Sequence, residues 1–154
     1  MKTVIISPYS QKLRNEKRNP KNFPHWKSVL QSLLEKNIKV IQIGTAGEEP
    51  LGATEFLTNL PLHKLEELVH TANTWASVDN FLPHLCNTIG KSGVVVFGAS
   101  DPAIFGYPQN INLLKDRSHL RQFQYDIWEA IEYNENVFVS PHDVVNSIVK
   151  LLKE

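Results

Sequence analysis

The chain has 154 residues, of which 42% are hydrophobic and 21% charged, and its 16 basic side chains balance 16 acidic ones. Because domains commonly have about 100–150 residues, we expect residues 1–154 to form a single domain with a hydrophobic core. Nucleic-acid-binding domains usually carry a net positive charge, so the neutral overall charge disfavours a nucleic-acid partner.

The apolar runs and the cysteine content bear on location. The longest apolar runs, such as Val94–Phe97, are strand-sized, whereas a membrane-spanning helix needs about 18 apolar residues. No secretory or lipidation signal is recognisable. The one cysteine, Cys86, lies among apolar helical positions and is expected to be a buried, inert thiol. These features predict a cytoplasmic protein without a membrane span.

The first part of the chain alternates strand and helix patterns. A β-branched run at Thr3–Ile6 predicts a strand that ends at Ser7. The polar, basic stretch from Tyr9 to Asn22 predicts a long loop. Apolar residues then recur at helical spacing over Trp26–Leu34, and Lys39–Thr45 predicts the second strand.

The same alternation continues through the middle of the chain. Leu51–Leu60 is ambiguous and has room for a short strand, whereas the apolar spacing of Leu62–Ala72 predicts a helix. Trp75–Val78 predicts a short strand, and Phe81–Ile89 the helix that follows, closed by a glycine. The fully apolar run at Gly93–Phe97 is typical of a strand buried on both faces of a parallel sheet.

The last third has weaker patterns. Ile111–Leu114 predicts a further short strand, the spacing over Leu120–Ile131 a helix, and Val137–Val139 an edge strand. Ser140 is a plausible N-cap for a terminal helix over Val145–Leu152. Strands that alternate with helices predict an α/β fold: a single Rossmann-like, three-layer domain with a mostly parallel sheet.

Polar turns follow four of the predicted strands. Ser7, Gly44–Glu49, Asp79–Asn80 and Gly98–Asp101 all come directly after strand patterns. Because ligands bind at the carboxyl ends of the strands in open α/β sheets, we expect these turns to converge on one binding edge.

The helix that follows Asp79 could bind an anion at its N-terminus. Its free amide groups and positive dipole end would suit a phosphate. Asp79 could equally serve only as the helix cap. His84, just over one turn into the helix, could help to hold a phosphate or polarise a leaving group, or it could be structural.

The basic loop and the glycine turn each allow two interpretations. The loop cations form either a solvated surface or a clamp over a polyanion, and Lys21 stands out because two nearby prolines stiffen its surroundings. Glu48 and Glu49 could accept hydrogen bonds from ribose hydroxyls or could simply be solvated.

Several familiar motifs are absent. The chain has no Gly-x-Gly-x-x-Gly, no P-loop and no Gly-x-Ser-x-Gly, which disfavours dinucleotide dehydrogenases, P-loop kinases and α/β-hydrolases. The remaining histidines show no metal-ligand spacing. We therefore expect no cofactor and no metal, and the catalytic residues are unknown.

The order and spacing of five motifs resemble a known family. They are a strand ending at Ser7, Lys21 before a Phe-Pro helix start, the Gly44–Glu49 turn, Asp79–His84 and Gly98–Pro102. The last two are similar to the patterns Asp-(Thr/Ser)-Gly-x-x-His and Gly-x-(Thr/Ser)-Asp-Pro. Over nearly its whole length the chain resembles the carboxyl-terminal, donor-binding half of the heptosyltransferase-like glycosyltransferases, the ADP-heptose:lipopolysaccharide group with two-domain GT-B architecture.

The resemblance implies binding of a nucleotide-diphosphate sugar, similar to an ADP-sugar. It places Asp79, His84, Lys21 and Ser7 near phosphate, and Glu48 or Glu49 near the nucleoside. The full set of ligand-binding residues that it implies is Ser7, Lys21, Glu48, Glu49, Asp79, Asn80, His84, Ser100 and Asp101.

The chain departs from the family in two ways. Asn80 and Phe81 replace the hydroxyl residue and the glycine after the aspartate, and a side chain at the glycine site should restrict the approach of backbone to phosphate. The acceptor-binding domain, which supplies the catalytic base in this family, has no counterpart in these residues. A partner chain or a homodimer is expected to supply that half; alternatively, the domain senses or sequesters a nucleotide-type ligand without transfer.

Overall fold

Short β-branched runs build a central sheet of six parallel strands. The computed structural model describes residues 1–154. The sheet order is β3-β2-β1-β4-β5-β6, and every neighbouring pair is parallel. The strands are β1 (Thr3–Ser7), β2 (Lys39–Gly44), β3 (Glu55–Thr58), β4 (Thr74–Val78), β5 (Val94–Val96) and β6 (Ile111–Leu113).

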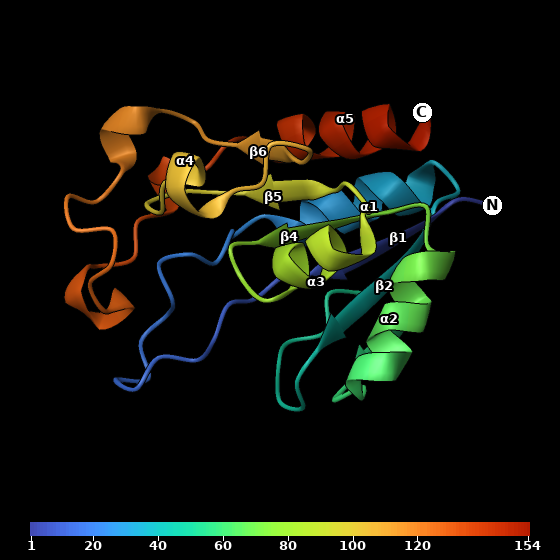
Figure 1. The fold of residues 1–154 in the computed structure, drawn as a ribbon, viewed down its shortest axis with the longest axis horizontal. Coiled ribbons are helices and arrows are strands. Elements are labelled where there is room, and N and C mark those ends of the chain that lie inside the picture. The colour runs from blue at the N-terminus through green and yellow to red at the C-terminus, as the bar shows by residue number, and fades with distance from the viewer.

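Helices cover both faces of the sheet (Figure 1). The α-helices are α1 (Trp26–Glu35), α2 (Leu62–Thr71), α3 (Leu82–Ile89), α4 (Pro102–Phe105) and α5 (Pro141–Leu152). Side chains of α1 and α5 pack in one core cluster, and those of α2 and α3 in a second cluster on the opposite face. The predicted α/β, three-layer domain is therefore confirmed, as is a short strand within 51–60.

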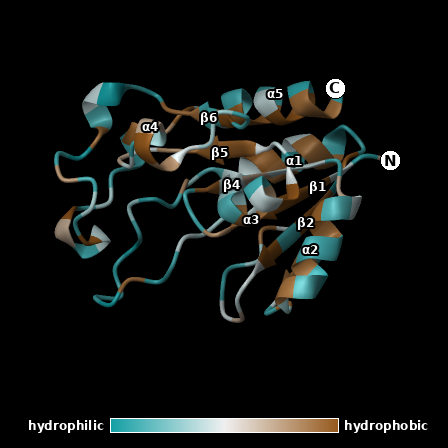
Figure 2. Ribbon diagram, viewed as in Figure 1, coloured by the Kyte–Doolittle hydropathy of each residue, from teal (hydrophilic) through white to brown (hydrophobic).

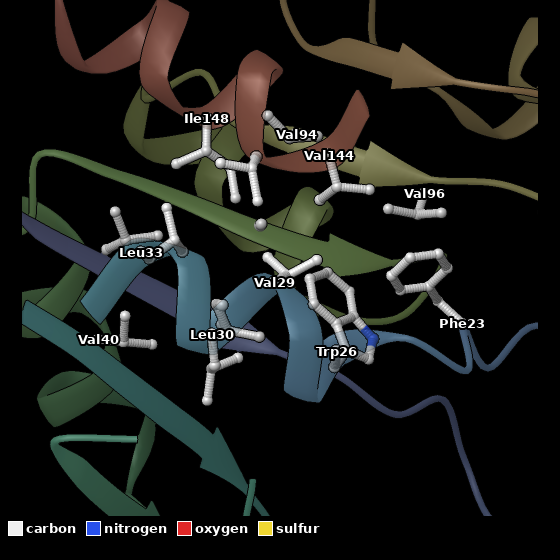
Figure 3. Packing of buried hydrophobic residues seen from close by; sticks show 14 of the residues in the cluster. Phe23, Trp26, Val29, Leu30, Leu33, Val40, Val94, Val96, Val144 and Ile148 are labelled. Atoms are coloured by element: carbon white, nitrogen blue, oxygen red, sulfur yellow. The ribbon is translucent and has the colours of Figure 1, made fainter. Parts of the chain in front are cut away.

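The larger core cluster lies between the sheet and the helices α1 and α5. Figure 3 shows Trp26, Val29 and Leu33 of α1 facing Val144 and Ile148 of α5, with the sheet beside them. All five side chains are buried. This packing holds α5 against the middle of the sheet.

The smaller cluster lies under α2 and α3 and contains the cysteine. Cys86 is fully buried beside Trp75 and Leu82, as the sequence predicts. Burial raises the pKa of its thiol to about 12, so the group stays protonated and unreactive at neutral pH.

The sheet reverses its order between β1 and β4. The chain moves outward from β1 to β2 and β3, then returns to the other side of β1 and continues through β4, β5 and β6. Ser7 and Ser77 are the last paired residues of β1 and β4 at the carboxyl end. In Figure 1 the carboxyl ends of the strands point to the side where the long loops lie, and both termini lie on the opposite side.

Hydropathy follows this arrangement. The strands are hydrophobic, whereas the loop that follows β1 is hydrophilic over most of its length (Figure 2). None of the helices combines the length and the apolar character that crossing a membrane requires.

Two helix ends carry the predicted capping groups. The Ser140 hydroxyl accepts a hydrogen bond from the Asp143 amide at the start of α5. Gly90 ends α3 in the left-handed conformation, with φ of 84°. Both caps agree with the sequence patterns.

The helix predicted over Leu120–Ile131 is wrong. That region is irregular chain apart from one 3₁₀ turn, η2 (Trp128–Ala130), and another 3₁₀ turn, η1 (Arg117–His119), ends just before it. The guanidinium of Arg121 donates to the carbonyls of Gln124, Asp126 and Ile127, which would otherwise accept helical bonds. The apolar residues behind the prediction do not form a buried face, since Phe123 is 67% and Ile127 is 53% exposed.

The edge strand predicted over Val137–Val139 is also wrong. Glu135–Val137 forms a 3₁₀ turn, η3, and β6 ends the sheet on this side. Val137 and Phe138 instead pack so closely on Gly98 that a Cβ there would lie 2.7 Å from each side chain. Their apolar pattern reflects burial in the core without strand pairing.

Removal of a core side chain from α5 should destabilise the protein. We expect Ile148→Ala to lower the free energy of unfolding by about 2–5 kcal/mol, because a cavity is left in a packed core. Lys150→Ala, at an exposed position on the same helix, should change it by less than about 0.5 kcal/mol. Urea denaturation checks both values, and equal effects of the two substitutions would contradict the packing of α5.

Candidate functional site

A large cleft opens at the carboxyl edge of the sheet, where the order reverses. Its volume is about 1340 Å³. Clefts for drug-sized ligands measure about 300–1,000 Å³, so this one has room for a larger ligand. Its walls come from the ends of β1, β2 and β4, the basic loop over residues 9–22, the turn over residues 44–49, and the first turn of α3.

Most of the predicted site residues line this cleft. The structure brings together seven of the nine, drawn from four separate segments of the chain: Ser7, Lys21, Glu48, Glu49, Asp79, Asn80 and His84. Ser100 and Asp101 are buried and do not line it. The expected convergence therefore holds for the turns after β1, β2 and β4, but not for the turn after β5.

Lys21 and Asp79, which both line the cleft, form an ion pair. The Lys21 ammonium lies 3.2 Å from Asp79 Oδ2, and the two side chains are only 18% and 10% exposed. Asp79 does not cap α3, because Phe81 occupies the N-cap position and the first helical amide, that of Leu82, donates to Asn80 instead. The capping role considered for Asp79 is thus wrong, and its carboxylate instead holds a lysine.

Asn80 joins the ends of β1 and β4. Its amide nitrogen donates to the carbonyls of Ser7 and Tyr9 and to the Ser7 hydroxyl, over 3.0–3.2 Å. Its Oδ1 accepts a hydrogen bond from the amide of Leu82. These bonds engage the amide nitrogen and one lone pair of the amide oxygen of Asn80, so the residue helps to build the floor of the cleft.

The N-terminus of α3 has few amides free for a ligand. Leu82 N–H is taken by Asn80, and Pro83 has no N–H. The backbone amides of Phe81 and His84 make no hydrogen bond within the chain. A bound anion would therefore meet two amides at this helix end.

Phe81 stands where the family pattern has glycine. Its backbone is regular right-handed helix, with φ of −69° and ψ of −30°, so no glycine is required for the turn. The side chain lines the cleft and is 47% exposed.

His84 faces the cleft from the first turn of α3 and contacts Tyr107. The imidazole Nδ1 and the Tyr107 hydroxyl are 2.7 Å apart, and the rings meet edge to face. This contact orients the ring from the side that does not belong to the cleft, since Tyr107 is not among the lining residues.

The two glutamates of the turn after β2 differ in their contacts. Glu48 Oε1 accepts hydrogen bonds from the amide and hydroxyl of Thr45, which closes the turn. A Cβ at Gly44 would lie 2.5 Å from the Glu48 carboxylate, so a larger residue there would displace this carboxylate from its present position. Glu49 pairs with Lys27 at 2.8 Å, and this pairing lowers the pKa of its carboxyl.

The turn after β5 is bound to the following irregular segment. Asp101 accepts from the amide of Ala103 and from both terminal nitrogens of Arg117, and the Arg117 bonds lower its pKa. Gln124 bridges the carbonyl of Ala99 and the amide of Asp101. These bonds attach the 117–124 segment to the turn after β5.

The basic loop is attached to the irregular segment around η2. Arg14 donates from its backbone amide and its Nε to Glu129, and Arg18 lies 4.1 Å from the Tyr133 ring centroid. The Tyr133 hydroxyl donates to the carbonyl of Asn22. The ring of Trp128 also contacts Lys21 of this loop. Trp128, Glu129 and Tyr133 therefore hold the loop, although no sequence motif singled them out.

The lining of the cleft combines two kinds of side chain. Four cations come from the basic loop: Lys12, Lys17, Arg18 and Lys21. Six of the apolar residues come from other segments of the chain: Ile43, Leu57, Leu60, Leu65, Phe81 and Phe105. Such a cleft suits a ligand with an anionic part and a flat or apolar part. No three His, Cys, Asp or Glu residues are grouped as metal ligands.

Sequence comparison finds no match for this chain. No protein-family model matches it, and no curated protein matches it.

The fold nevertheless matches solved heptosyltransferases. An ADP-heptose lipopolysaccharide heptosyltransferase II from E. coli superposes with a TM-score of 0.72 at 16% identity, over 99% of this chain and 46% of that one. A glycosyl transferase family 9 protein from Veillonella parvula gives 0.71 at 17% identity, over 99% and 46%. The dodecameric, iron-containing heptosyltransferase TibC of E. coli, in complex with ADP-D-β-D-heptose, gives 0.63 at 16% identity, over 99% and 45%.

These similarities confirm the predicted fold. The chain spans about half the length of the solved structures that it matches. It is an α/β domain of the kind found in heptosyltransferases, with its cleft at the point where the strand order reverses.

The attachment of the basic loop should weaken in acid. Hydrogen bonds from Arg14 lower the pKa of Glu129 from 4.5 to about 2. A carboxyl group whose pKa is lower in the folded state than in the unfolded state stabilises the fold at a pH above its unfolded-state pKa. This contribution is lost as the pH falls toward the folded-state pKa. The difference in unfolding free energy between wild type and Glu129→Gln should therefore be constant above pH 5 and shrink below about pH 4.5.

Urea denaturation between pH 7 and pH 3 measures this difference. Glu132→Gln is the matched control. Glu132 is 90% exposed, and its ion pair with Lys17 is long, at 3.9 Å, so the substitution should have little effect at any pH. A difference for Glu129→Gln that is the same at pH 7 and pH 3 would contradict the attachment.

Proposed function

We propose that the cleft binds a nucleotide-diphosphate sugar similar to an ADP-sugar, as the donor site of a glycosyltransferase system. One observation carries the proposal: a cleft at the strand-order reversal holds a largely buried, ion-paired lysine and is also lined by apolar side chains. Open α/β sheets bind nucleotides at this position. The complex of TibC with ADP-D-β-D-heptose, a structure of similar fold, supports the choice of ligand.

The diphosphate would lie near Lys21 and the start of α3. An ammonium is a compact charge that suits phosphate oxygens, and the amides of Phe81 and His84 lie at the same edge. The His84 ring, oriented by Tyr107, would add a further donor to this group. In the free protein Asp79 neutralises Lys21, so an incoming diphosphate would compete with Asp79 for the ammonium.

The nucleoside would occupy the other half of the cleft. A base can lie against the apolar side chains, with its ribose toward the turn after β2. Glu48 is the better acceptor for a ribose hydroxyl, because its Oε2 makes no hydrogen bond within the chain. Glu49 already pairs with Lys27. Ser7, Asn80, Ser100 and Asp101 would act by shaping the cleft floor and its surroundings.

Transfer also needs an acceptor and a catalytic base. The residues that line the cleft identify neither, so we infer that another surface, from a partner chain or a second copy, completes the reaction. A cytoplasmic location, predicted from composition, stays part of this proposal.

Binding of ADP tests the donor site directly. We expect isothermal titration calorimetry to detect ADP binding to the wild type, and Lys21→Met to weaken it about 10- to 100-fold, because a hydrogen bond to a charged group is lost. Lys150→Met, on the outer face of α5, should leave the affinity unchanged.

Thermal unfolding provides the independent readout. ADP at 100 times its dissociation constant should stabilise the wild type by about 2.7 kcal/mol. The donor site is refuted if millimolar ADP neither releases heat nor raises the melting temperature, or if Lys21→Met binds ADP as tightly as the wild type.

A further inference from the structure

Lys21 contacts an aromatic ring from a distant part of the chain. Its ammonium lies 4.8 Å from the ring centroid of Trp128, in addition to its contact with Asp79. Trp128 begins η2, in the region where the sequence pattern wrongly predicts a helix. The other two tryptophans, Trp26 and Trp75, are buried in the two core clusters, so Trp128 alone among them lies beside the cleft cations.

The Trp128 ring is itself held by Arg121. The Arg121 guanidinium lies 3.5 Å from the ring centroid. It donates to the carbonyls of Gln124, Asp126 and Ile127, which fixes its plane. Cation–π contacts to tryptophan are the strongest of their kind, so this arrangement gives Trp128 a defined position.

The support continues to the turn after β5. The backbone amide of Arg121 donates to the carbonyl of Ala99, and Gln124 also binds that carbonyl. The turn therefore connects to the cleft through Arg121 and Trp128, although Ser100 and Asp101 do not line the cleft themselves. The turn after β5 thus supports a residue beside the cleft, although the turn does not line the cleft itself.

We propose that Trp128 is a positioning residue for Lys21, with Arg121 as its support. The inference rests on the proposed function, since it assigns Lys21 to the diphosphate of the donor. A lysine has a flexible four-carbon stem, and fixing it costs conformational entropy on binding. The Trp128 ring attracts the cation without accepting a conventional hydrogen bond, so the ammonium keeps N–H donors for Asp79 and for phosphate.

A double-mutant cycle on the whole chain separates positioning from general stability. We expect Trp128→Leu to weaken ADP binding about fivefold, as loss of a cation–π contact at a partly buried site implies. In a Lys21→Met background the same substitution should have no further effect, because the group that it positions is gone. Phe123→Leu, an exposed aromatic in the same segment, is the matched control and should leave ADP affinity unchanged.

A conservative variant keeps the test decisive. Trp128→Phe retains a ring with a weaker attraction for cations, so it should bind ADP with an affinity between those of wild type and Trp128→Leu. If Trp128→Leu does not fold, the cycle with Trp128→Phe is judged by the same criterion.

The outcomes distinguish this inference from the proposed function. Failure of the wild type to bind ADP overturns both. If the wild type binds ADP and Lys21→Met weakens binding, but Trp128→Leu and Trp128→Phe do not, only the positioning role is overturned. It is also overturned if substitution of Trp128 weakens ADP binding equally with and without Lys21.

Discussion

The reversal of strand order between β1 and β4 is the constraint on which the rest of the structure depends. At a reversal of strand order, the loops that leave neighbouring strands run in opposite directions. A cleft therefore opens between the loops after β1 and β2 and the loop after β4, at the carboxyl edge of the sheet. Asn80 spans this separation by binding Ser7 and Tyr9 from the end of β4. This side chain thus adds a link between the two halves of the cleft floor, just beyond the last paired residues of β1 and β4, Ser7 and Ser77.

The polar residues around the cleft divide into those that build it and those that remain available. Asn80 and the Oε1 atom of Glu48 are engaged in the turns that shape the walls. Lys21 and His84 face the cleft while held by neighbours, Asp79 and Tyr107. A ligand would meet groups already in place, which lowers the entropic cost of binding. This division explains how residues of one motif, Asp79 to His84, can differ in their roles.

Local patterns in the sequence predict the regular part of the fold. The β-branched runs and the helical spacing of apolar residues identify the buried strands and α1, α2, α3 and α5, because burial imposes these periods. They also place Ser7 and Asp79 at one edge, with His84 one turn into the next helix, since parallel strands bring their carboxyl ends together. Those residues are the part of the candidate site that local reasoning can reach. The position of Lys21 beside them is implied only by the resemblance to the glycosyltransferase family.

The remainder depends on contacts between distant residues. Leu120–Ile131 has helical spacing, yet Arg121 takes three of its carbonyls, and this competition is not visible in the pattern. The contacts of Glu129 with Arg14 and of Trp128 with Lys21 join residues more than 100 positions apart. Asp79 looks like a helix cap in the sequence because its partner, Lys21, lies in a loop far from it.

A crystal structure of the chain with bound ADP tests the central claim most directly. We predict that the diphosphate lies in the cleft between β1 and β4, with phosphate oxygens within hydrogen-bond distance of Lys21 Nζ and the backbone amides of Phe81 or His84. ADP bound away from this edge of the sheet, or bound in the cleft with its phosphates turned away from Lys21, would contradict the assignment of the cleft as a donor site.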